Sequence, residues 1–129
     1  MDIKQELLQK NVKWAVVGAS NNLDKYGHKI YKKLRERGYT VYPVNPNYEE
    51  VMGDKCYKDL NSLPEKVDAI NMVVPSNVGI GIIEEAKALG IQNIWLQPGS
   101  ESREIITFSN ENNLDSIQSC ILVELKYMH

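Results

Sequence analysis

The residues with the clearest potential for chemistry lie between positions 18 and 29. Gly18-Ala19-Ser20 ends the apolar run Trp14–Val17, and Gly27 opens a segment in which apolar residues recur at helical spacing. Such a turn presents backbone N–H groups, and the helix after it favours a phosphate through its free donors and its dipole. We expect Gly27 to leave room for a ligand, with positive charge added by Lys25, His28 and Lys29. The pattern predicts an anion site, although tight turns alone would also explain both glycines.

Two further segments carry residues suited to a nucleotide. Asn45 and Pro46 follow the β-rich run Thr40–Val44, where NAD-binding folds usually place an acidic residue for the ribose hydroxyls. A carboxylate there would repel a phosphorylated ribose, so its absence favours a ribose-phosphate nucleotide over NAD. Val74-Pro75 offers apolar contact for an adenine, and Ser76 could contact the ligand or only cap the next helix.

Strands and helices alternate along the chain, and this alternation must position the three segments. Apolar periodicity and turn residues predict strands at 14–17, 40–44, 68–74, 93–96 and 114–117, and helices at 2–9, 27–37, 78–89 and 102–112. The alternation is typical of a parallel sheet with helices on both faces.

We therefore expect an α/β fold in a single domain spanning residues 1–129. The expected sheet is Rossmann-like, doubly wound, parallel and five-stranded, with strand order 3-2-1-4-5 and three α/β/α layers. In such sheets ligands bind beyond the carboxyl ends of the strands, where the strand order reverses. The three segments would meet at that point.

Composition and charge exclude several classes of protein. The 129 residues carry a formal net charge of −2, so no overall basic field would attract nucleic acid or an anionic membrane. The N-terminal residues lack the apolar core of a signal peptide, and no apolar run approaches the length of a membrane span. We expect a cytoplasmic protein in which Cys56 and Cys120 are free thiols, and no residues have the spacing of metal ligands.

Several longer motifs carry a resemblance to a known family. These are VVGAS, GYTVYPVNPNYEEVMGDKCY, VVPSNV, IWLQPGSES and a late cysteine in CILVE. On them the chain resembles the small, stand-alone coenzyme A-binding proteins, whose Rossmann-like domains are similar to the nucleotide-binding domain of the succinyl-CoA synthetase α-subunit. The resemblance covers nearly the whole chain, from Lys13 to Glu124.

What the resemblance implies is a site for CoA or an acyl-CoA as the small-molecule partner. The first segment would hold the diphosphate, the second the ribose and its phosphate, the third the adenine, and the crevice beyond them the pantetheine arm. The residues expected there, in that order, are Gly18, Ala19, Ser20, Asn21, Tyr26 and Gly27; Asn45, Pro46 and Tyr48; Val74, Pro75 and Ser76; and Gln97 and Gly99. Lys29 joins the expected site through its positive charge and not through the resemblance. Many relatives carry arginine or serine near Tyr26, where this chain has Lys25-Tyr26-Gly27, so the resemblance does not assign the cation that faces the phosphates.

The expected function is a non-catalytic CoA-binding protein, with coenzyme A as its ligand and an unknown protein partner. The family's larger relatives make acyl-CoA through a phosphohistidine in a separate domain, and His28 is not expected to take that role. No Ser/His/Asp set, carboxylate pair or metal cluster stands out, so we expect no enzyme activity. One alternative is a redox enzyme, either NAD(P)-dependent or exchanging thiols with CoA through Cys120, although a buried structural cysteine is the simpler expectation. Another alternative is an interaction module with a vestigial crevice.

Overall fold

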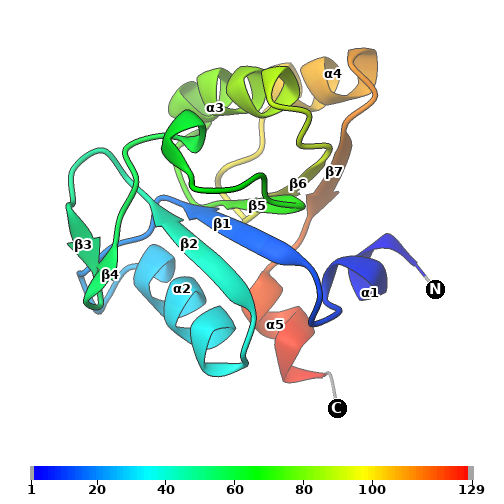
Figure 1. The fold of residues 1–129 in the computed structure, drawn as a ribbon. Coiled ribbons are helices and arrows are strands. Elements are labelled where there is room, and N and C mark those ends of the chain that lie inside the picture. Colours follow the sequence, from blue (N-terminus) through cyan, green and yellow to red (C-terminus); the bar gives the residue numbers. More distant parts are fainter. Residues whose placement is uncertain (1, 128–129) are drawn as a thin grey trace.

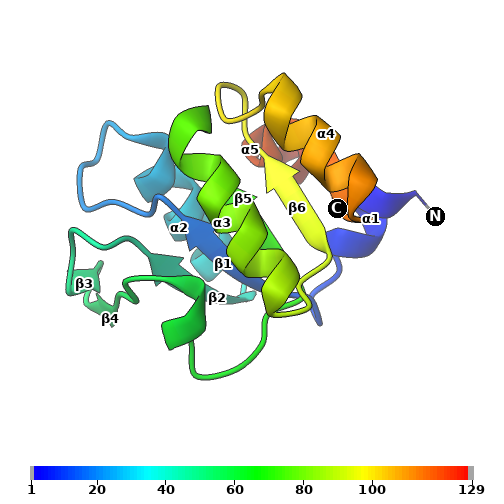
Figure 2. The ribbon, with the colours of Figure 1, turned by 90° about the horizontal axis from the view of Figure 1, so that it is seen from above.

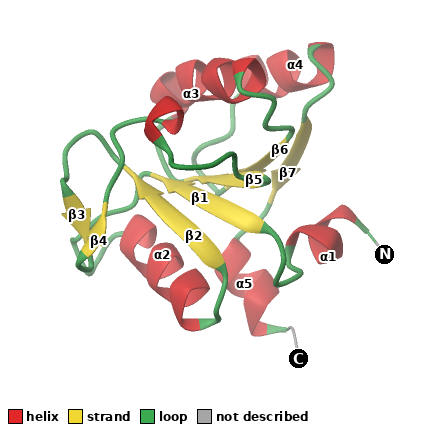
Figure 3. Ribbon diagram, viewed as in Figure 1, coloured by secondary structure: helices red, strands yellow, loops and turns green. Residues whose placement is uncertain are grey.

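The structure, a computed structural model, describes residues 2–127. The domain has three layers. A sheet of five parallel strands is covered by helices on both faces (Figures 1 and 3), as predicted. The strands are β1 (Lys13–Val17), β2 (Thr40–Val44), β5 (Ala69–Met72), β6 (Asn93–Leu96) and β7 (Asp115–Gln118). One face carries α1 (Ile3–Leu7), α2 (Tyr26–Glu36) and α5 (Ile121–Lys126). The other face carries α3 (Ser76–Ala88) and α4 (Arg103–Glu111), which lie side by side (Figure 2).

The segment between β2 and β5 adds three short elements at one edge of the sheet. β3 (Glu50–Val51) and β4 (Asp54–Lys55) pair antiparallel, and η1 (Leu60–Ser62) is a single 3₁₀ turn. The hairpin lies beside the β1–α2 loop, to which Asn21 binds it. This segment therefore places side chains next to the carboxyl ends of β1 and β2.

The strand order is β2-β1-β5-β6-β7, so the predicted order 3-2-1-4-5 is wrong. The third main strand, β5, pairs with β1 and not with the outer edge of β2. All four residues of β5 are buried, as in a central strand, whereas β2 begins with the exposed Thr40. The carbonyl of Pro43 points away from β1 and accepts from the Tyr57 N–H. In a strand the N–H and carbonyl of one residue point to the same side, so the missing N–H of Pro43 costs no bond to β1. Proline is tolerated on such an edge, and the order still reverses between β1 and β5.

Hydrophobic cores fill both sides of the sheet. Trp14 and Trp95 pack edge-on beneath α2 and α5, with ring centroids 6.0 Å apart. On the other side, Ile70 and Ile94 pack with Ile83 of α3. Because β1 and β5 are covered on both faces, their residues form apolar runs without the alternation of a half-exposed strand.

The two ends of the described chain lie close together. Asp2 and Gln5 form a capping box at the start of α1. An ion pair between Lys4 Nζ and Glu124 Oε1, 3.2 Å apart, joins α1 to α5, a helix that the sequence did not predict. Within residues 2–127, no helix combines the length and the apolar character needed to cross a bilayer.

Candidate functional site

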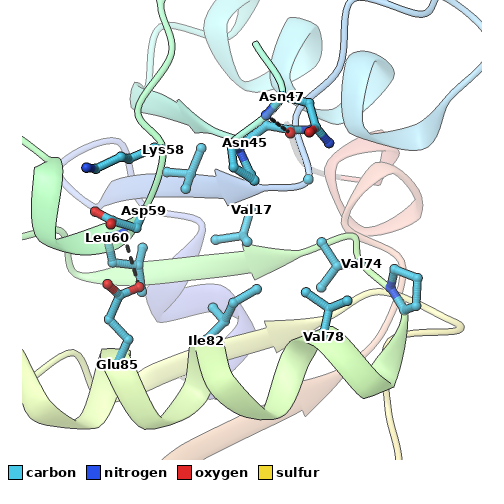
Figure 4. Close-up of a pocket in the computed structure, with 14 residues that line it drawn as sticks. Val17, Asn45, Asn47, Lys58, Asp59, Leu60, Val74, Val78, Ile82 and Glu85 are labelled. Atoms are coloured by element: carbon cyan, nitrogen blue, oxygen red, sulfur yellow. Dashed lines mark hydrogen bonds between the residues drawn. The ribbon is translucent and has the colours of Figure 1, made fainter. Parts of the chain in front are cut away.

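A cleft of about 410 Å³ opens at the carboxyl ends of β1, β2 and β5 (Figure 4). It lies where the strand order reverses, which is the usual ligand position in doubly wound sheets. Its aliphatic lining consists of Val17, Val44, Leu60, Val74, Val78 and Ile82. The remaining lining residues are Gly18, Asn45, Pro46, Asn47, Lys58, Asp59, Pro75 and Glu85. The three segments identified in the sequence therefore meet at one cleft.

Two glycines set the shape of the turn between β1 and α2. Gly18 has a φ of +102°, and its N–H donates to the Val44 carbonyl over 2.9 Å. A Cβ on Gly18 would lie 2.9 Å from the carbonyl carbon of Val73, and a Cβ on Gly27 would overlap the Gly18 carbonyl, 2.9 Å from its carbon. The atoms that Gly27 avoids thus belong to the protein's own turn, which corrects our expectation that it leaves room for a ligand.

The helices that begin beside the cleft have no capping side chain. In α2 the His28 and Lys29 N–H groups both donate to the Lys25 carbonyl, and in α3 the corresponding acceptor is the Pro75 carbonyl. The two N–H groups that precede these in each helix, at residues 26, 27, 76 and 77, have no protein acceptor among residues 2–127. Neither helix has an acidic residue in its first turn. Both ends therefore keep N–H donors available to an anion.

Other polar side chains of the β1–α2 loop are engaged within the protein. The Ser20 hydroxyl accepts from the Asn22 N–H and lies 3.2 Å from the Tyr48 hydroxyl. Asn21 donates to the Glu50 carbonyl over 2.7 Å and accepts from the Met52 N–H over 3.0 Å. These contacts hold the loop against the β3–β4 hairpin.

The side chains predicted beside the anion at the start of α2 contact other parts of the protein. His28 is buried, and its Nδ1 donates to the Ser20 carbonyl over 3.0 Å. Tyr26 is exposed, with the Lys29 Nζ 5.4 Å from its ring centroid. None of these side chains lines the cleft.

Asn45 connects the end of β2 to the turn after β1. Its Nδ2 donates to the Ala19 carbonyl over 2.9 Å, and its Oδ1 accepts from the Asn47 N–H over 2.9 Å. The position that carries an acid in NAD-binding folds therefore holds a neutral amide with both of its polar atoms bonded. The acids that follow in sequence, Glu49 and Glu50, do not line the cleft.

Three charged residues that the sequence did not indicate line the cleft, namely Lys58, Asp59 and Glu85. Glu85 accepts from the Leu60 N–H over 3.1 Å and from the Asn61 side chain over 2.5 Å. Asp59 caps η1 by accepting from the Ser62 N–H over 2.9 Å. The two carboxylates therefore fix η1 at one end of the cleft (Figure 4).

The predicted residues after β6 do not reach the cleft. Gln97 is buried, and its Oε1 accepts from Asn71 Nδ2 over 3.3 Å and from the Ile121 N–H over 2.8 Å, which caps α5. Gly99 is exposed, with a φ of +97°. Ser100, which the sequence did not indicate, donates to the Val74 carbonyl over 2.6 Å and accepts from the Val74 N–H. It thereby fixes the end of β5 beside the cleft.

Five of the predicted site residues line the cleft: Gly18, Asn45, Pro46, Val74 and Pro75. The others lie outside its lining, and they are Ala19, Ser20, Asn21, Tyr26, Gly27, Lys29, Tyr48, Ser76, Gln97 and Gly99. Among these, the residues of the β1–α2 loop and of the first turns of α2 and α3 lie next to the N–H groups that have no protein acceptor. Their contact with a ligand stays a prediction.

The two thiols differ in burial, and neither lines the cleft. Cys56 is buried, and burial raises the pKa of its thiol. Cys120 is half-buried at the start of α5. Across residues 2–127, no three His, Cys, Asp or Glu side chains are grouped as metal ligands would be.

A family model described as the CoA binding domain matches residues 12–126. The chain belongs to the CoA-binding domain family. It is 30% identical to the Bacillus subtilis protein YneT, described as uncharacterized, over 120 residues that cover 92% of this chain and 89% of YneT. A conserved hypothetical protein from Pyrococcus furiosus superposes on this CoA-binding domain with a TM-score of 0.83 and 45% identity, covering 88% of this chain and 98% of that one.

The CoA-binding domain also matches part of a much larger enzyme. It is 32% identical to an ADP-forming acetate–CoA ligase of Methanocaldococcus jannaschii over 103 residues. That stretch is 80% of this chain but only 14% of the ligase. The similarity thus extends both to small proteins of matching length and to one portion of a ligase.

Proposed function

We propose that this CoA-binding domain binds CoA or an acyl-CoA in the cleft and performs no reaction on it. The observation that carries the proposal is the pair of uncapped helix ends, α2 and α3, beside an apolar cleft at the point of strand-order reversal. The free N–H groups and both helix dipoles favour a diphosphate there. An adenine would then pack against aliphatic side chains such as Val74 and Val78.

The end of β2 favours CoA over NAD as the ligand. NAD-binding folds use an acid at this position to bind the ribose hydroxyls, and here Asn45 is neutral and already bonded on both polar atoms. The ribose of CoA carries a phosphate, which an acid at this position would repel. A neutral strand end is therefore compatible with CoA.

The groups in the cleft support binding without chemistry. Glu85 accepts hydrogen bonds on both carboxylate oxygens and Asp59 accepts on Oδ1, and these bonds fix η1. Cys120 lies outside the cleft lining, and thiol exchange through it stays an alternative prediction. The similarity to a ligase covers only 14% of that enzyme, and its activity is not carried over.

Binding is tested by thermal unfolding and calorimetry with CoA, acetyl-CoA and NAD. At a hundredfold excess over its dissociation constant, a ligand of the folded state adds about 2.7 kcal/mol to the free energy of unfolding. For a domain of this size, that raises the melting temperature by about 10 °C. Equal shifts with NAD and CoA at matched concentration would overturn the proposal.

A matched pair of variants tests whether the cleft is the site. Val78 and Val123 are each the third residue of a helix, α3 and α5, and they are 50% and 51% exposed. Val78→Glu places a negative charge in the cleft lining and should abolish CoA binding, whereas Val123→Glu lies outside it and should leave binding unchanged. Both substitutions put an acid in a first turn, where it favours the helix. Equal CoA affinity in the two variants would place the ligand elsewhere.

A further inference from the structure

We propose that Lys58 selects ligands that carry a phosphate ester on the ribose of their adenosine, which in CoA is the 3′-phosphate. The inference rests on the proposed function, because it names the part of the nucleotide that one edge of the cleft recognises. It also supplies the cation that the β1–α2 loop does not bring to the cleft.

The backbone places Lys58 beside the end of β2. The Tyr57 N–H donates to the Pro43 carbonyl over 3.0 Å, and the Asn45 N–H donates to the Tyr57 carbonyl over 2.9 Å. Tyr57 thereby bridges to Val44, and Lys58 follows directly at the edge of the cleft (Figure 4). In dinucleotide-binding folds this strand end holds an acid for free ribose hydroxyls, or has a cation nearby when the ribose is phosphorylated. Lys58 is a cation near this strand end, as in the folds that bind a phosphorylated ribose.

Lys58 differs from neighbouring lysines in having no partner. Within residues 2–127 it is the only cation that lines the cleft, and it makes no hydrogen bond, ion pair or ring contact. By contrast, Lys55 Nζ lies 5.3 Å from the Tyr57 ring centroid, and Lys13 Nζ lies 2.5 Å from Glu65 Oε1. The ammonium of Lys58 is therefore available to a ligand.

Neither carboxylate of the cleft forms an ion pair with Lys58 in the part of the chain that the structure describes. Glu85 accepts from the Leu60 N–H and from the Asn61 backbone and side chain. Asp59 accepts on Oδ1 from both the N–H and the hydroxyl of Ser62, over 2.9 and 2.7 Å. A phosphate monoester carries a charge of about −1.5 to −2 at pH 7. Because the diphosphate is assigned to the helix N-termini, the ribose phosphate is the anionic group that the β2 end leaves for Lys58.

The test compares CoA with dephospho-CoA by calorimetry for the wild type, Lys58→Met and Lys55→Met. Both substitutions remove one exposed positive charge from the same segment, but Lys55 does not line the cleft. We expect Lys58→Met to weaken CoA binding about five- to tenfold, an effect between an exposed ion pair and a charge-assisted hydrogen bond. Dephospho-CoA binding should stay unchanged, and Lys55→Met should change neither affinity. The wild-type preference for CoA should shrink as salt rises from about 0.05 to about 0.5 M.

The outcomes separate the failure of this inference from that of the proposed function. Wild type that binds neither CoA nor dephospho-CoA would overturn the proposed function. If wild type and Lys58→Met prefer CoA over dephospho-CoA equally, only the role of Lys58 is overturned. The same holds if Lys58→Met has an unchanged melting temperature but loses affinity for both ligands equally. NADP and NAD form a second pair of ligands. A preference for NADP that depends on Lys58, without one for CoA, would support the role in phosphate recognition and overturn CoA as the ligand.

Discussion

Replacing Gly27 by alanine should destabilise the protein, although alanine is the better helix former. In a helix interior, alanine is favoured over glycine by about 0.8–1.0 kcal/mol. At Gly27 the new Cβ would overlap the Gly18 carbonyl oxygen and would lie 2.9 Å from its carbon and 3.3 Å from the Ala19 Cα. Contacts between carbon atoms are optimal at about 3.5–4.0 Å, and the overlap with the carbonyl oxygen is more severe than these contacts, so α2 or the turn has to move.

The turn that Gly27 contacts is held on two sides and cannot shift freely. The Gly18 N–H is bonded to the Val44 carbonyl, and the Ala19 carbonyl accepts from Asn45. Overpacking a well-packed site costs about 1–3 kcal/mol, and a backbone obstacle places this site at the upper end. Because Gly27 is the second residue of α2, alanine gains at most the interior propensity there, so Gly27→Ala should lower the free energy of unfolding by at least about 2 kcal/mol.

Gly81 provides the matched control because it lies in the interior of α3 and a Cβ there meets no atom within 4 Å. Gly81→Ala should raise the free energy of unfolding by about 0.8–1.0 kcal/mol. Equilibrium urea unfolding of both variants should therefore show changes of opposite sign, at least about 3 kcal/mol apart. Gly27→Ala should also weaken CoA binding, since the start of α2 has to move. Equal stabilisation by the two substitutions would refute the contact between α2 and the turn.

Three further predictions concern groups away from the cleft. Burial raises the pKa of Tyr31, and a hydrogen bond to a carboxylate raises the pKa of Tyr42 to about 12. The unfolded chain releases these protons near pH 10 and the folded protein does not. In urea unfolding, the stability contributed by the two tyrosines should therefore be fully present below pH 10 and lost toward pH 12, and this loss should be smaller in Tyr31→Phe. In alkylation followed by mass spectrometry, Cys120 should react before the buried Cys56, and the reverse order would contradict the burial of Cys56. Gln97→Leu should cost about 1–3 kcal/mol of stability because the Ile121 N–H loses its acceptor, while unchanged CoA affinity would remove Gln97 from the ligand site.

Local patterns predicted most of the elements that carry the cleft. Thr40–Val44 is an apolar, β-rich run followed by a turn, and the observed strand has the same bounds. The order of the strands could not be derived in the same way, because the apolar run at β5 does not specify which strand it pairs with. The position of Pro43, whose missing N–H faces outward, is the one local signal that places β2 at an edge.

Features whose position depends on contacts between distant parts of the chain could not be predicted from the sequence. Lys58 and Asp59 come from an irregular segment, and their place in the cleft follows from the bridge between Tyr57 and Val44. The missed helix α5 begins without a capping side chain of its own, since its cap comes from Gln97 on another strand end. In both cases the deciding partner is distant in sequence, and a pattern of neighbouring residues contains no information about it.

The ion pair between Lys4 and Glu124 has a consequence for how such a domain can be joined to other chains. It joins α1 to α5 on the face of the sheet that carries α2 (Figure 1), whereas the helix that lines the cleft, α3, lies on the other face. A polypeptide attached near residue 2 or residue 127 would therefore depart from a side that does not cover the cleft. The mouth of the cleft would thus stay open whether the domain stands alone or is joined to another polypeptide at either end.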